Sequence, residues 1–354
     1  MVVVLLLLAG TGADAASRGT RPSQPAPARP ATQAYPGFGY KTTGGAGRPT
    51  FTVTTLADAG PGSLRDGLGQ AGQGGGTIRF AVGGGITLES GLDVPSRTTI
   101  DGSSAPAPGI TLWGARTGAR GTGVLNLYES NVVLRGLRIR DAGNDGVHIA
   151  PRRRRPVANI VVDHCSITNS GDGGIDVTGR DELPVTDVTI VANYLAGNGG
   201  PCPKGLCGGG SLANHGATRL SYYFNLWDRN LRRTPSVVGP NAVADVRYNV
   251  IRDTQQGSIQ IRDGAQANLV GNTLQGRRGE TAAVALWGGR AHVDDTPSDV
   301  TGQQAIAALP VPRVPPARAA PVVIRQAGAL PRDAVDRSLV ERAGESAAGG
   351  TSRR

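Results

Sequence analysis

The chain has 354 residues, of which 54 are glycine and only 4% are aromatic, a composition that suits a fold with many tight turns. Its 37 lysines and arginines exceed its 27 aspartates and glutamates, and the net charge of +10 favours an anionic partner without naming one. Beyond the first residues no stretch is apolar enough to cross a bilayer, which excludes an integral membrane protein and gives no membrane partner.

The N-terminal segment has the features of an export signal. Val2 to Ala9 form an apolar core, and Ala13-Asp-Ala15 follows as a small-residue cleavage site, so residues 1–15 are predicted to be a secretory signal peptide. Residues 16–34 are rich in Pro, Ala, Arg and Ser, a composition typical of a flexible linker. We therefore expect a secreted, extracellular protein.

A short motif then recurs along the chain. It consists of an apolar residue, two variable positions, a small or amide residue, one variable position and a second apolar residue. Its centres at 137, 165, 193, 225, 249 and 272 differ by 28, 28, 32, 24 and 23 residues. Periods of this size indicate a solenoid. The six copies, written as first apolar residue, centre and second apolar residue, are Leu134/Leu137/Ile139, Val162/Cys165/Ile167, Ile190/Asn193/Leu195, Tyr222/Asn225/Trp227, Val246/Asn249/Ile251 and Leu269/Asn272/Leu274.

The local pattern decides the type of solenoid. Apolar residues alternate with period two in Asn131 to Ile139 and in Asp187 to Val191, which is the periodicity of strands and not of helices. Stacked coils of short strands would bury a continuous column of aliphatic side chains, so residues 35–300 are predicted to form one all-β domain, a single parallel β-helix. The four asparagines at the last centres either stack as a hydrogen-bonded ladder or only mark turns, and both interpretations give the same architecture.

The longer coils place charged side chains at similar distances after their centres. Asp145 lies 8 residues after its centre, Asp172 and Asp176 lie 7 and 11 after theirs, Lys204 lies 11 after and Arg233 lies 8 after. Ile175 and Val177 would point into the core and turn Asp176 outward. An offset of 28 residues puts His148 beneath Asp176 and Lys204 above it. We expect these residues to line a groove over four coils, roughly 15 Å of stacking.

Three clustered carboxylates repel one another unless a cation lies between them. An oxygen-only site in an exported protein predicts Ca²⁺, held by Asp145, Asp172 and Asp176. The alternative is that the three are solvated turn residues, since Asp145 and Asp172 each precede a glycine and Asp176 closely follows two. His148 either contacts metal or substrate or is an ordinary exposed strand histidine.

Several further motifs follow one another along the chain. They are Tyr35-Pro-Gly-Phe-Gly-Tyr-Lys-Thr-Thr-Gly-Gly45, Val53-Thr-Thr-Leu-Ala-Asp-Ala-Gly-Pro-Gly-Ser-Leu-Arg65, Thr99-Ile-Asp-Gly102, Ala105-Pro106, Val162-Asp-His-Cys-Ser166, Asp172-Gly-Gly-Ile-Asp176, Arg232-Arg-Thr-Pro235 and Leu330-Pro-Arg-Asp-Ala-Val-Asp336. With these motifs in the family's order, the chain resembles the pectate lyase family, secreted polysaccharide lyases with a right-handed parallel β-helix. The resemblance covers roughly residues 35 to 345.

The resemblance implies a role for each of the five groove residues. Asp145, Asp172 and Asp176 match the family's calcium ligands, Arg233 matches its catalytic base and Lys204 its substrate-binding lysine. The implied reaction is β-elimination in polygalacturonate, in which the base removes the proton beside the carboxylate and calcium stabilises the charge that develops. Because a guanidinium stays protonated to about pH 12, this role requires neighbouring cations and a high working pH.

One departure from the family pattern bears on the substrate. A second arginine, which the family often carries five residues after the base, is Val238 here and cannot pair with a carboxylate. Three alternatives therefore stay open. The chain could be a non-catalytic β-helical carbohydrate-binding or surface protein, a lyase for another uronate polymer, or a glycoside hydrolase with paired carboxylates, although Arg233 favours a lyase over a hydrolase.

The three cysteines agree with export. Cys202 and Cys207 bracket Lys204 in a glycine-rich loop and are a candidate disulfide, while Cys165 at a motif centre is expected to be a buried thiol. A metal site for the pair is disfavoured because no histidine pattern accompanies it. An insertion in this loop would shift Lys204 out of register with the groove.

The remaining predictions concern the C-terminus and partners. Residues 301–345 form an Ala- and Pro-rich extension whose part from about 321 packs back on the solenoid, and residues 346–354 are expected to be disordered. The run Arg152-Arg-Arg-Arg155 lacks interleaved aromatic residues and lies in a turn, which argues against a nucleic-acid partner. We expect a monomer that binds an anionic polysaccharide.

Overall fold

The computed structural model describes residues 35–348 apart from 115–120, 153, 181, 203–204, 276–283, 299–310 and 312. The predicted signal peptide and linker at residues 1–34 lie outside the described residues, as do residues 349–354.

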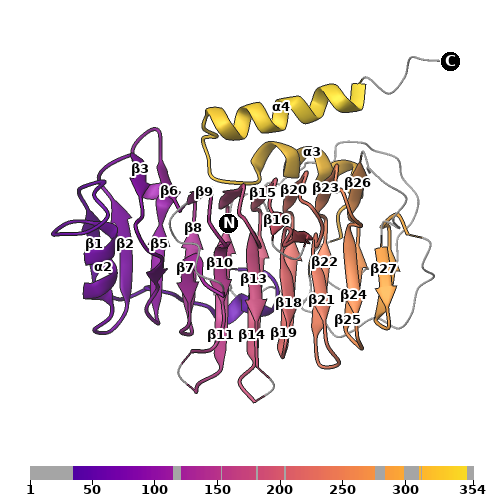
Figure 1. Cartoon of the computed structure of the whole chain (residues 1–354), viewed down its shortest axis with the longest axis horizontal. Helices are drawn as coiled ribbons and strands as arrows, with labels where there is room; N and C mark the ends of the chain where they lie inside the picture. The colour runs from indigo at the N-terminus through magenta and orange to yellow at the C-terminus, as the bar shows by residue number, and fades with distance from the viewer. Residues whose placement is uncertain are drawn as a thin grey trace, which may run out of the picture.

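Three parallel sheets run the length of the molecule and form the walls of a right-handed β-solenoid (Figure 1), which confirms the predicted fold class. Sheet A has ten strands: β1 (Thr50–Val53), β2 (Gly76–Phe80), β5 (Thr98–Asp101), β8 (Val132–Arg135), β11 (Val157–Asp163), β14 (Val185–Val191), β19 (Ala217–Tyr223), β22 (Val243–Arg247), β25 (Gln266–Val270) and β28 (Arg290–Asp294). Sheet B has eight: β3 (Gly84–Thr87), β6 (Ile110–Trp113), β9 (Arg138–Arg140), β12 (Ser166–Thr168), β15 (Tyr194–Ala196), β20 (Leu226–Asp228), β23 (Val250–Arg252) and β26 (Thr273–Gln275). Sheet C also has eight: β4 (Leu92–Asp93), β7 (Gly123–Leu127), β10 (Asp145–Ile149), β13 (Ile175–Thr178), β18 (Leu212–Asn214), β21 (Ser236–Val238), β24 (Ile259–Arg262) and β27 (Val284–Trp287).

The repeated motif corresponds to two stacked columns in the core. In sheet A its first apolar residues are direct register partners from one coil to the next, running from Leu134 to Leu269. In sheet B its last apolar residues pair in the same way, from Ile139 to Leu274. Leu134, Val162, Ile190, Tyr222, Val246 and Leu269 are all fully buried. Each coil therefore packs its apolar side chains on its neighbours, which is how a solenoid builds a continuous core.

The asparagines at the motif centres form a buried ladder between sheets A and B. The side-chain oxygen of Asn225 accepts hydrogen bonds from the backbone N–H and the side-chain amide of Asn193, at 2.9 and 3.1 Å. Asn225 in turn donates through its side-chain amide to Asn249 and to the Ile190 carbonyl, at 3.0 and 2.8 Å. The same pattern continues through Asn272 to Thr296. The ladder satisfies the backbone groups that the turn takes out of the sheets.

We expect Asn225→Ala to lower the free energy of unfolding by about 3 kcal/mol or more, because it leaves several buried donors and acceptors without partners at about 1–3 kcal/mol each. Urea denaturation measures the change. Asn241→Ala, which truncates an exposed asparagine, is the matched control. An Asn225→Ala variant as stable as that control would contradict a structural ladder.

A short helix closes the N-terminal end of the core. In α2 (Leu64–Ala71) the side chain of the N-cap residue Ser63 accepts a hydrogen bond from the backbone N–H of Asp66. Leu64, Leu68 and Ala71 are buried against the first coil. The remaining short elements are the 3₁₀ helices η1 (Phe38–Lys41) and η2 (Gly102–Ser104) and the antiparallel hairpin of β16 (Gly200–Cys202) and β17 (Gly205–Cys207).

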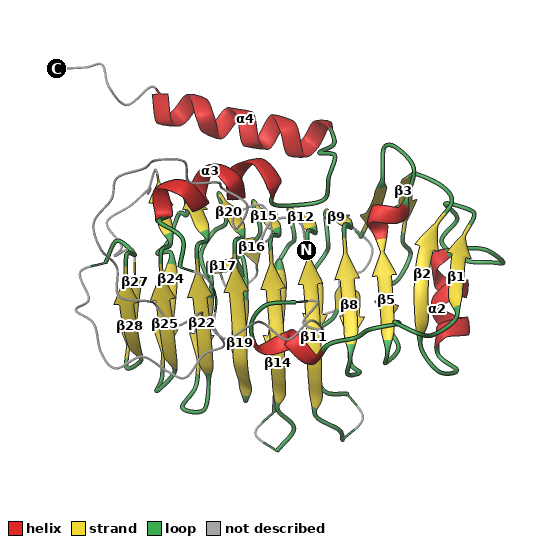
Figure 2. Cartoon of the chain, turned by 180° about the vertical axis from the view of Figure 1, so that it is seen from behind, coloured by secondary structure: helices red, strands yellow, loops and turns green. Residues whose placement is uncertain are grey.

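The C-terminal segment is more ordered than the sequence predicted. Helices α3 (Pro316–Gln326) and α4 (Ala334–Ala348) lie along one side of the solenoid (Figures 1 and 2), so the packed part begins before residue 321 and α4 runs past the predicted boundary at residue 345. Buried side chains of α3 join a second apolar cluster with Tyr194, Leu226 and Val250 on the outer face of sheet B. This explains the extra order, because the segment covers apolar surface that would otherwise face water.

Buried ion pairs attach the same segment to sheet B. Arg140 is 2% exposed and its Nη2 lies 2.7 Å from Asp336 Oδ1, which is fully buried. Asp333 lies near both Arg140, at 3.3 Å, and Arg138, at 3.5 Å. Removing one partner of such a pair would leave a buried charge uncompensated, so these contacts hold the segment in one place.

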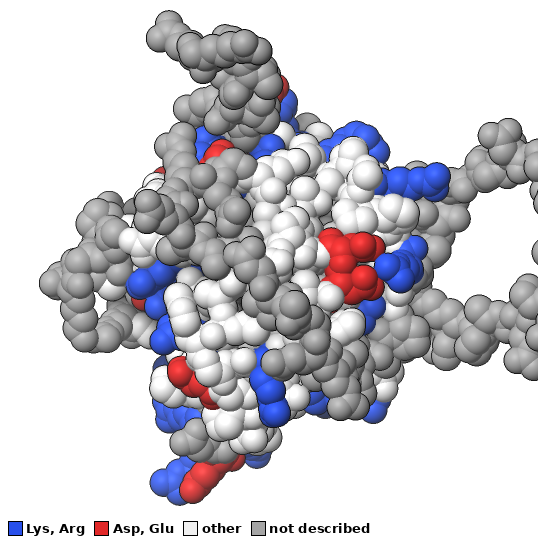
Figure 3. Space-filling model, turned by 90° about the vertical axis from the view of Figure 1, so that its right-hand side faces the viewer, with Lys and Arg blue, Asp and Glu red and all other residues white. Residues whose placement is uncertain are grey.

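The surface charge does not form one basic patch at the end of the solenoid beyond β27. Figure 3 shows several acidic and basic groups there, some of them side by side, with uncharged surface between the groups. In the described part of the chain no helix is both long and apolar enough to span a membrane.

Candidate functional site

Three carboxylates converge at the strands β10 and β13 of sheet C. Asp145 begins β10, Asp176 lies within β13, and Asp172 is in the turn that leads into β13. One oxygen from each of the three lies within 4.8 Å of the others. The cluster that the coil spacing predicted therefore exists, and its members come from two neighbouring coils.

Register and hydrogen bonds hold two of these carboxylates in place. Ile175 and Val177 are fully buried in the core, so Asp176 between them faces outward, as predicted. Its Oδ1 accepts a hydrogen bond from the Leu212 N–H at 2.9 Å. Asp145 Oδ1 accepts from the Gly173 N–H at 2.8 Å. Both carboxylates are thus held in a fixed orientation, Asp176 on the outer face of sheet C and Asp145 at the start of β10.

Arg233 joins the cluster from the turn before β21. Its Nη1 lies 3.8 Å from Asp172 Oδ1, and its side chain is 21% exposed. Two glycines allow this approach. A Cβ on Gly208 would lie 2.2 Å from the Asp172 carbonyl oxygen, and a Cβ on Gly209 would lie 2.1 Å from that of Arg232. Both glycines also adopt positive φ, 75° and 152°. Arg233 belongs to the fourth of the successive coils that contain β10, β13, β18 and β21, and its side chain reaches back to Asp172.

Burial dominates the electrostatics of the carboxylates. Desolvation raises the pKa of Asp145 to about 8, and Asp172 adds to the effect while the Gly173 N–H and Arg233 oppose it. Desolvation likewise raises the pKa of Asp176, with the Asp145 charge as the next cause. The positive charge of the described residues is therefore not enough to keep both buried carboxylates ionised. A bound cation would stabilise their ionised forms.

His148 lies where the sequence placed it. It is the register partner of Asp176, and its Nδ1 is 2.9 Å from Asp145 Oδ2. Its ring meets that of Tyr128 edge to face at 6.3 Å. The residue is 8% exposed, and burial lowers its pKa, so the imidazole is neutral at pH 7. His148 is therefore part of the carboxylate cluster and not an ordinary exposed strand histidine.

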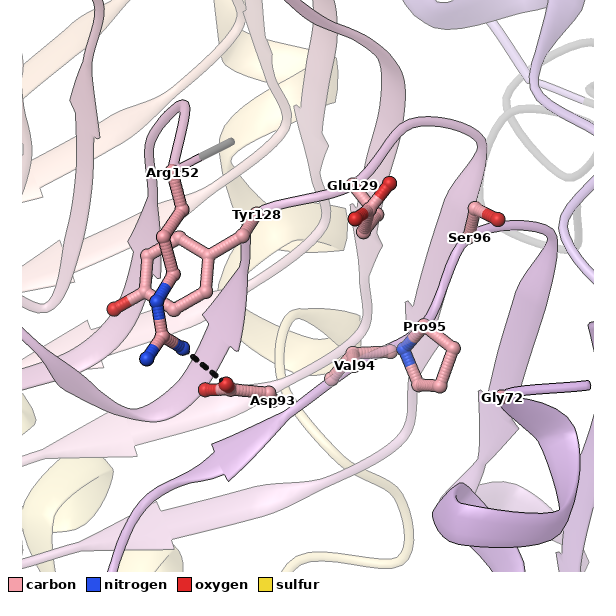
Figure 4. Close-up of a pocket in the computed structure, with 8 residues that line it drawn as sticks. All are labelled: Gly72, Asp93, Val94, Pro95, Ser96, Tyr128, Glu129 and Arg152. Atoms are coloured by element: carbon pink, nitrogen blue, oxygen red, sulfur yellow. Dashed lines mark hydrogen bonds and ion pairs between the residues drawn. The ribbon is translucent and has the colours of Figure 1, made fainter. Parts of the chain in front are cut away.

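Two adjoining pockets extend the site from His148 toward β4. The larger has a volume of about 530 Å³ and is lined by His148, Asn126 and Arg180 among others. The smaller, of about 330 Å³, is drawn in Figure 4, where Arg152 points at Asp93 beside the Tyr128 ring. Both pockets contain Asp93, Tyr128 and Arg152. Arg152 was predicted only as part of a basic run in a turn, and Tyr128 was not among the predicted site residues.

The sequence comparisons agree with this fold. The family model described as "Right handed beta helix region" matches residues 122–296. The chain is 31% identical over 241 residues to the probable pectate lyase C of Emericella nidulans, covering 67% of this chain and 51% of that protein. It is 30% identical over 245 residues to the probable pectate lyase C of Aspergillus terreus, covering 67% of this chain and 52% of that protein. The chain belongs to the pectate lyase family. It spans about half the length of these curated relatives.

Solved structures show the same solenoid. The major allergen of cedar pollen superposes with a TM-score of 0.61 at 23% identity, over 84% of this chain and 94% of the allergen. A Bacillus pectate lyase solved in complex with trigalacturonate superposes with a TM-score of 0.57 at 16% identity, over 82% of this chain and 98% of that enzyme. At these identities the comparison establishes the fold that this member of the pectate lyase family shares with them.

The predicted stacking of Lys204 above Asp176 is wrong. Val177 pairs with Ala213, so the residue beside Asp176 on the next coil is Leu212, 36 positions on in the sequence. The coil is longer than 28 residues because the hairpin of β16 and β17 projects from it. Lys204 itself lies outside the described residues, so its role in this pectate lyase family member stays a prediction.

The structure describes the side chains of two of the three cysteines. Cys207 is disulfide-bonded, and Cys165 is a buried free thiol whose pKa burial raises to about 12. The side chain of Cys202, the predicted partner, lies outside the described residues.

Proposed function

We propose that this chain is a secreted, calcium-dependent polysaccharide lyase that cleaves pectate by β-elimination. The observation that carries the proposal is the convergence of Asp145, Asp172 and Asp176 with a cationic side chain, Arg233 Nη1, 3.8 Å from Asp172. The names of the curated relatives and the trigalacturonate complex of a Bacillus pectate lyase support pectate as the substrate.

The donor set fits calcium. Three carboxylate oxygens within 4.8 Å of one another form an oxygen-only site for a hard cation, and substrate and water oxygens can complete the shell. The raised pKa values of Asp145 and Asp176 indicate that burial disfavours their ionised forms unless positive charge is added. Asp145, Asp172 and Asp176 would hold the ion. When bound, calcium withdraws charge from the substrate carboxylate and so acidifies the neighbouring C–H.

Arg233 supplies the base in this proposal. At alkaline pH its neutral guanidine takes the proton from the carbon beside the substrate carboxylate and becomes the guanidinium. The electron pair of that C–H bond forms a carbon–carbon double bond as the glycosidic C–O bond breaks. The expelled oxygen takes up a proton, so the reaction yields one saturated end and one unsaturated uronate. Asp172 beside the guanidinium keeps Arg233 aimed at the site, and His148 and Lys204 are the proposed substrate-binding residues.

Export belongs to the same proposal. Residues 1–15 are the proposed signal peptide, and the disulfide at Cys207 is the kind of bond that persists in oxidising compartments. A polymer too large to enter a cell requires an enzyme outside it.

The test is to incubate the purified chain with polygalacturonate at alkaline pH and to follow the ultraviolet absorbance of the unsaturated product. We expect absorbance to rise with calcium and to stop rising when a chelator is added. Binding of the polymer without any rise would instead identify a non-catalytic carbohydrate-binding protein, and cleavage without the ultraviolet signal would identify a hydrolase.

A further inference from the structure

The C-terminal segment covers a second group of charged side chains on sheet B. Asp228 on β20 and Arg252 on β23 are register partners. The residues before them, Trp227 and Ile251, lie in the core, so the two charged side chains face outward. Helix α3 packs against β23 there, and Asp228 is fully buried while Arg252 is 6% exposed. The segment therefore encloses an arginine that belongs to neither of the ion pairs described above.

Arg252 has too few acceptors around it. Its one ion pair among the described residues is with Asp228, whose Oδ2 lies 3.5 Å from Arg252 Nη2. That oxygen already accepts hydrogen bonds from the Tyr194 hydroxyl at 3.1 Å and from Arg229 at 3.0 Å. Nε and Nη2 of Arg252 are buried and have no hydrogen-bond partner. Since a guanidinium has five N–H donors and no acceptor, a buried one with unpaired donors costs stability.

A second arginine approaches the same place from the C-terminal segment. The Arg332 guanidinium lies over the ring of Tyr194, 6.0 Å from its centroid, and Tyr194 is the residue that bonds to Asp228. Nη2 of Arg332 donates to two carbonyls at the C-terminal end of α3, whereas its Nε is buried without a hydrogen-bond partner. Burial lowers the pKa of Arg332, Asp336 opposes this effect, and the charge of Arg252 adds to it. Two buried guanidiniums with unpaired donors thus lie near one carboxylate that is already shared.

We propose that Arg252 and Arg332 bind a small inorganic anion, chloride, between sheet B and the C-terminal segment. The anion accepts hydrogen bonds from the unpaired donors of both arginines, and its charge offsets the repulsion between them. The low exposure of Arg252 favours a small spherical ion over a sulfate or a sugar carboxylate. One arginine belongs to the solenoid and the other to the segment, so the bound ion holds the segment in place. The site lies on sheet B and does not depend on the proposed lyase function at sheet C.

Thermal unfolding at constant ionic strength tests this site, with sodium chloride replaced stepwise by sodium gluconate. Chloride at about ten times its dissociation constant should raise the wild-type midpoint by about 2 °C. Arg252→Gln should lose this response. In chloride-free buffer the same variant should be at least as stable as the wild type, because a buried charge without an adequate partner is gone.

Arg247→Gln is the matched control. Arg247 is another largely buried arginine, 16% exposed on sheet A, but its Nε has a carboxylate acceptor of its own, Asp245 Oδ1, at 2.6 Å. The variant should be less stable than the wild type, because it leaves Asp245 without this partner, and it should keep the full chloride response. This control separates the loss of an anion site from a general loss of stability.

Limited proteolysis measures the effect on the segment itself. If release of the segment frees the ion, subtilisin should cleave between α3 and α4 about tenfold more slowly in that chloride concentration than without chloride. Arg252→Gln should be cleaved at the same rate in both buffers. Arg332→Gln tests the other arginine, including the case in which Arg252→Gln does not fold, and should also lose the chloride effect.

Bromide locates the ion. Wild-type crystals grown in sodium bromide should show an anomalous peak within hydrogen-bond distance of Arg252 and Arg332, and Arg252→Gln crystals should not. A peak without any halide effect on unfolding would indicate an adventitious ion only and would overturn the site. Equal chloride responses of the wild type and Arg252→Gln would overturn it too, as would a crystal structure in which Asp228 Oδ1 accepts from Arg252 and no halide is bound.

Discussion

We expect Arg233→Lys to lower kcat for elimination by about 10³-fold or more while the β-helix stays folded. A positioned base contributes about 10²–10⁴-fold, and a lysine cannot place its nitrogen where Nη1 lies, 3.8 Å from Asp172, with the same planar geometry. The turn itself is held by backbone contacts, since the Ser211 N–H donates to the Arg233 carbonyl, so the side chain is not needed for folding. Initial rates of unsaturated product measure the change.

Arg219→Lys is the matched control for this prediction. Arg219 is a 47% exposed arginine on sheet A that pairs with Asp187, whereas the carboxylate cluster lies on sheet C. Its replacement should leave the rate within about twofold, the size expected of a surface ion pair. An Arg233→Lys enzyme that turns over at the wild-type rate would remove Arg233 as the base.

The core was predictable from the sequence because stacking imposes a repeat. Leu134 and Val162 occupy equivalent positions in successive coils, so both must be apolar, and the same constraint runs to Leu269. Asn225 repeats for the same reason, since each amide must bond to the one above it. A pattern that recurs at every coil is visible without an alignment.

The positions of the carboxylate cluster could be predicted from a constant sequence offset only where successive coils have equal length. The offset of 28 residues relates His148 to Asp176 correctly, because β10 and β13 belong to coils of that length. It fails for the next coil, where the hairpin of β16 and β17 adds residues and brings Leu212 beside Asp176. An insertion in a turn leaves the strands stacked and changes only the number of residues in the coil. A fixed sequence offset therefore gives the wrong neighbour for Asp176 on that coil.

The contacts made by features without a repeat partner were not predictable, although the sequence predicted that the C-terminal segment packs on the solenoid. The C-terminal helices pack on sheet B through contacts that occur once in the chain, such as that of Arg140 with Asp336. Nothing in the coil periodicity indicates these contacts. Arg332 in the same segment lies over the ring of Tyr194, and the two residues are far apart in the sequence. Such pairs become visible only in the folded structure.

The second large effect is expected at Asp176. Asp176→Asn keeps the acceptor for the Leu212 N–H but removes a charge from the cluster, so we expect kcat to fall by about 10²–10³-fold and calcium to stop stabilising the protein. In the metal-free wild type, the raised pKa values of Asp145, about 8, and Asp176 mean that the folded state binds protons more tightly than the unfolded state. Ionising them therefore costs stability as pH rises from about 4 to about 8.

Two results follow for thermal unfolding. Calcium binds the ionised carboxylates, so it should raise the wild-type midpoint more at pH 8 than at pH 5. The metal-free Asp176→Asn protein should be more stable than the metal-free wild type at pH 8, because one buried charge is gone, and it should show little response to calcium at either pH. Asp187→Asn, which changes a carboxylate on sheet A, should keep the full calcium response. Equal stabilisation of Asp176→Asn and the wild type by calcium would place the ion elsewhere.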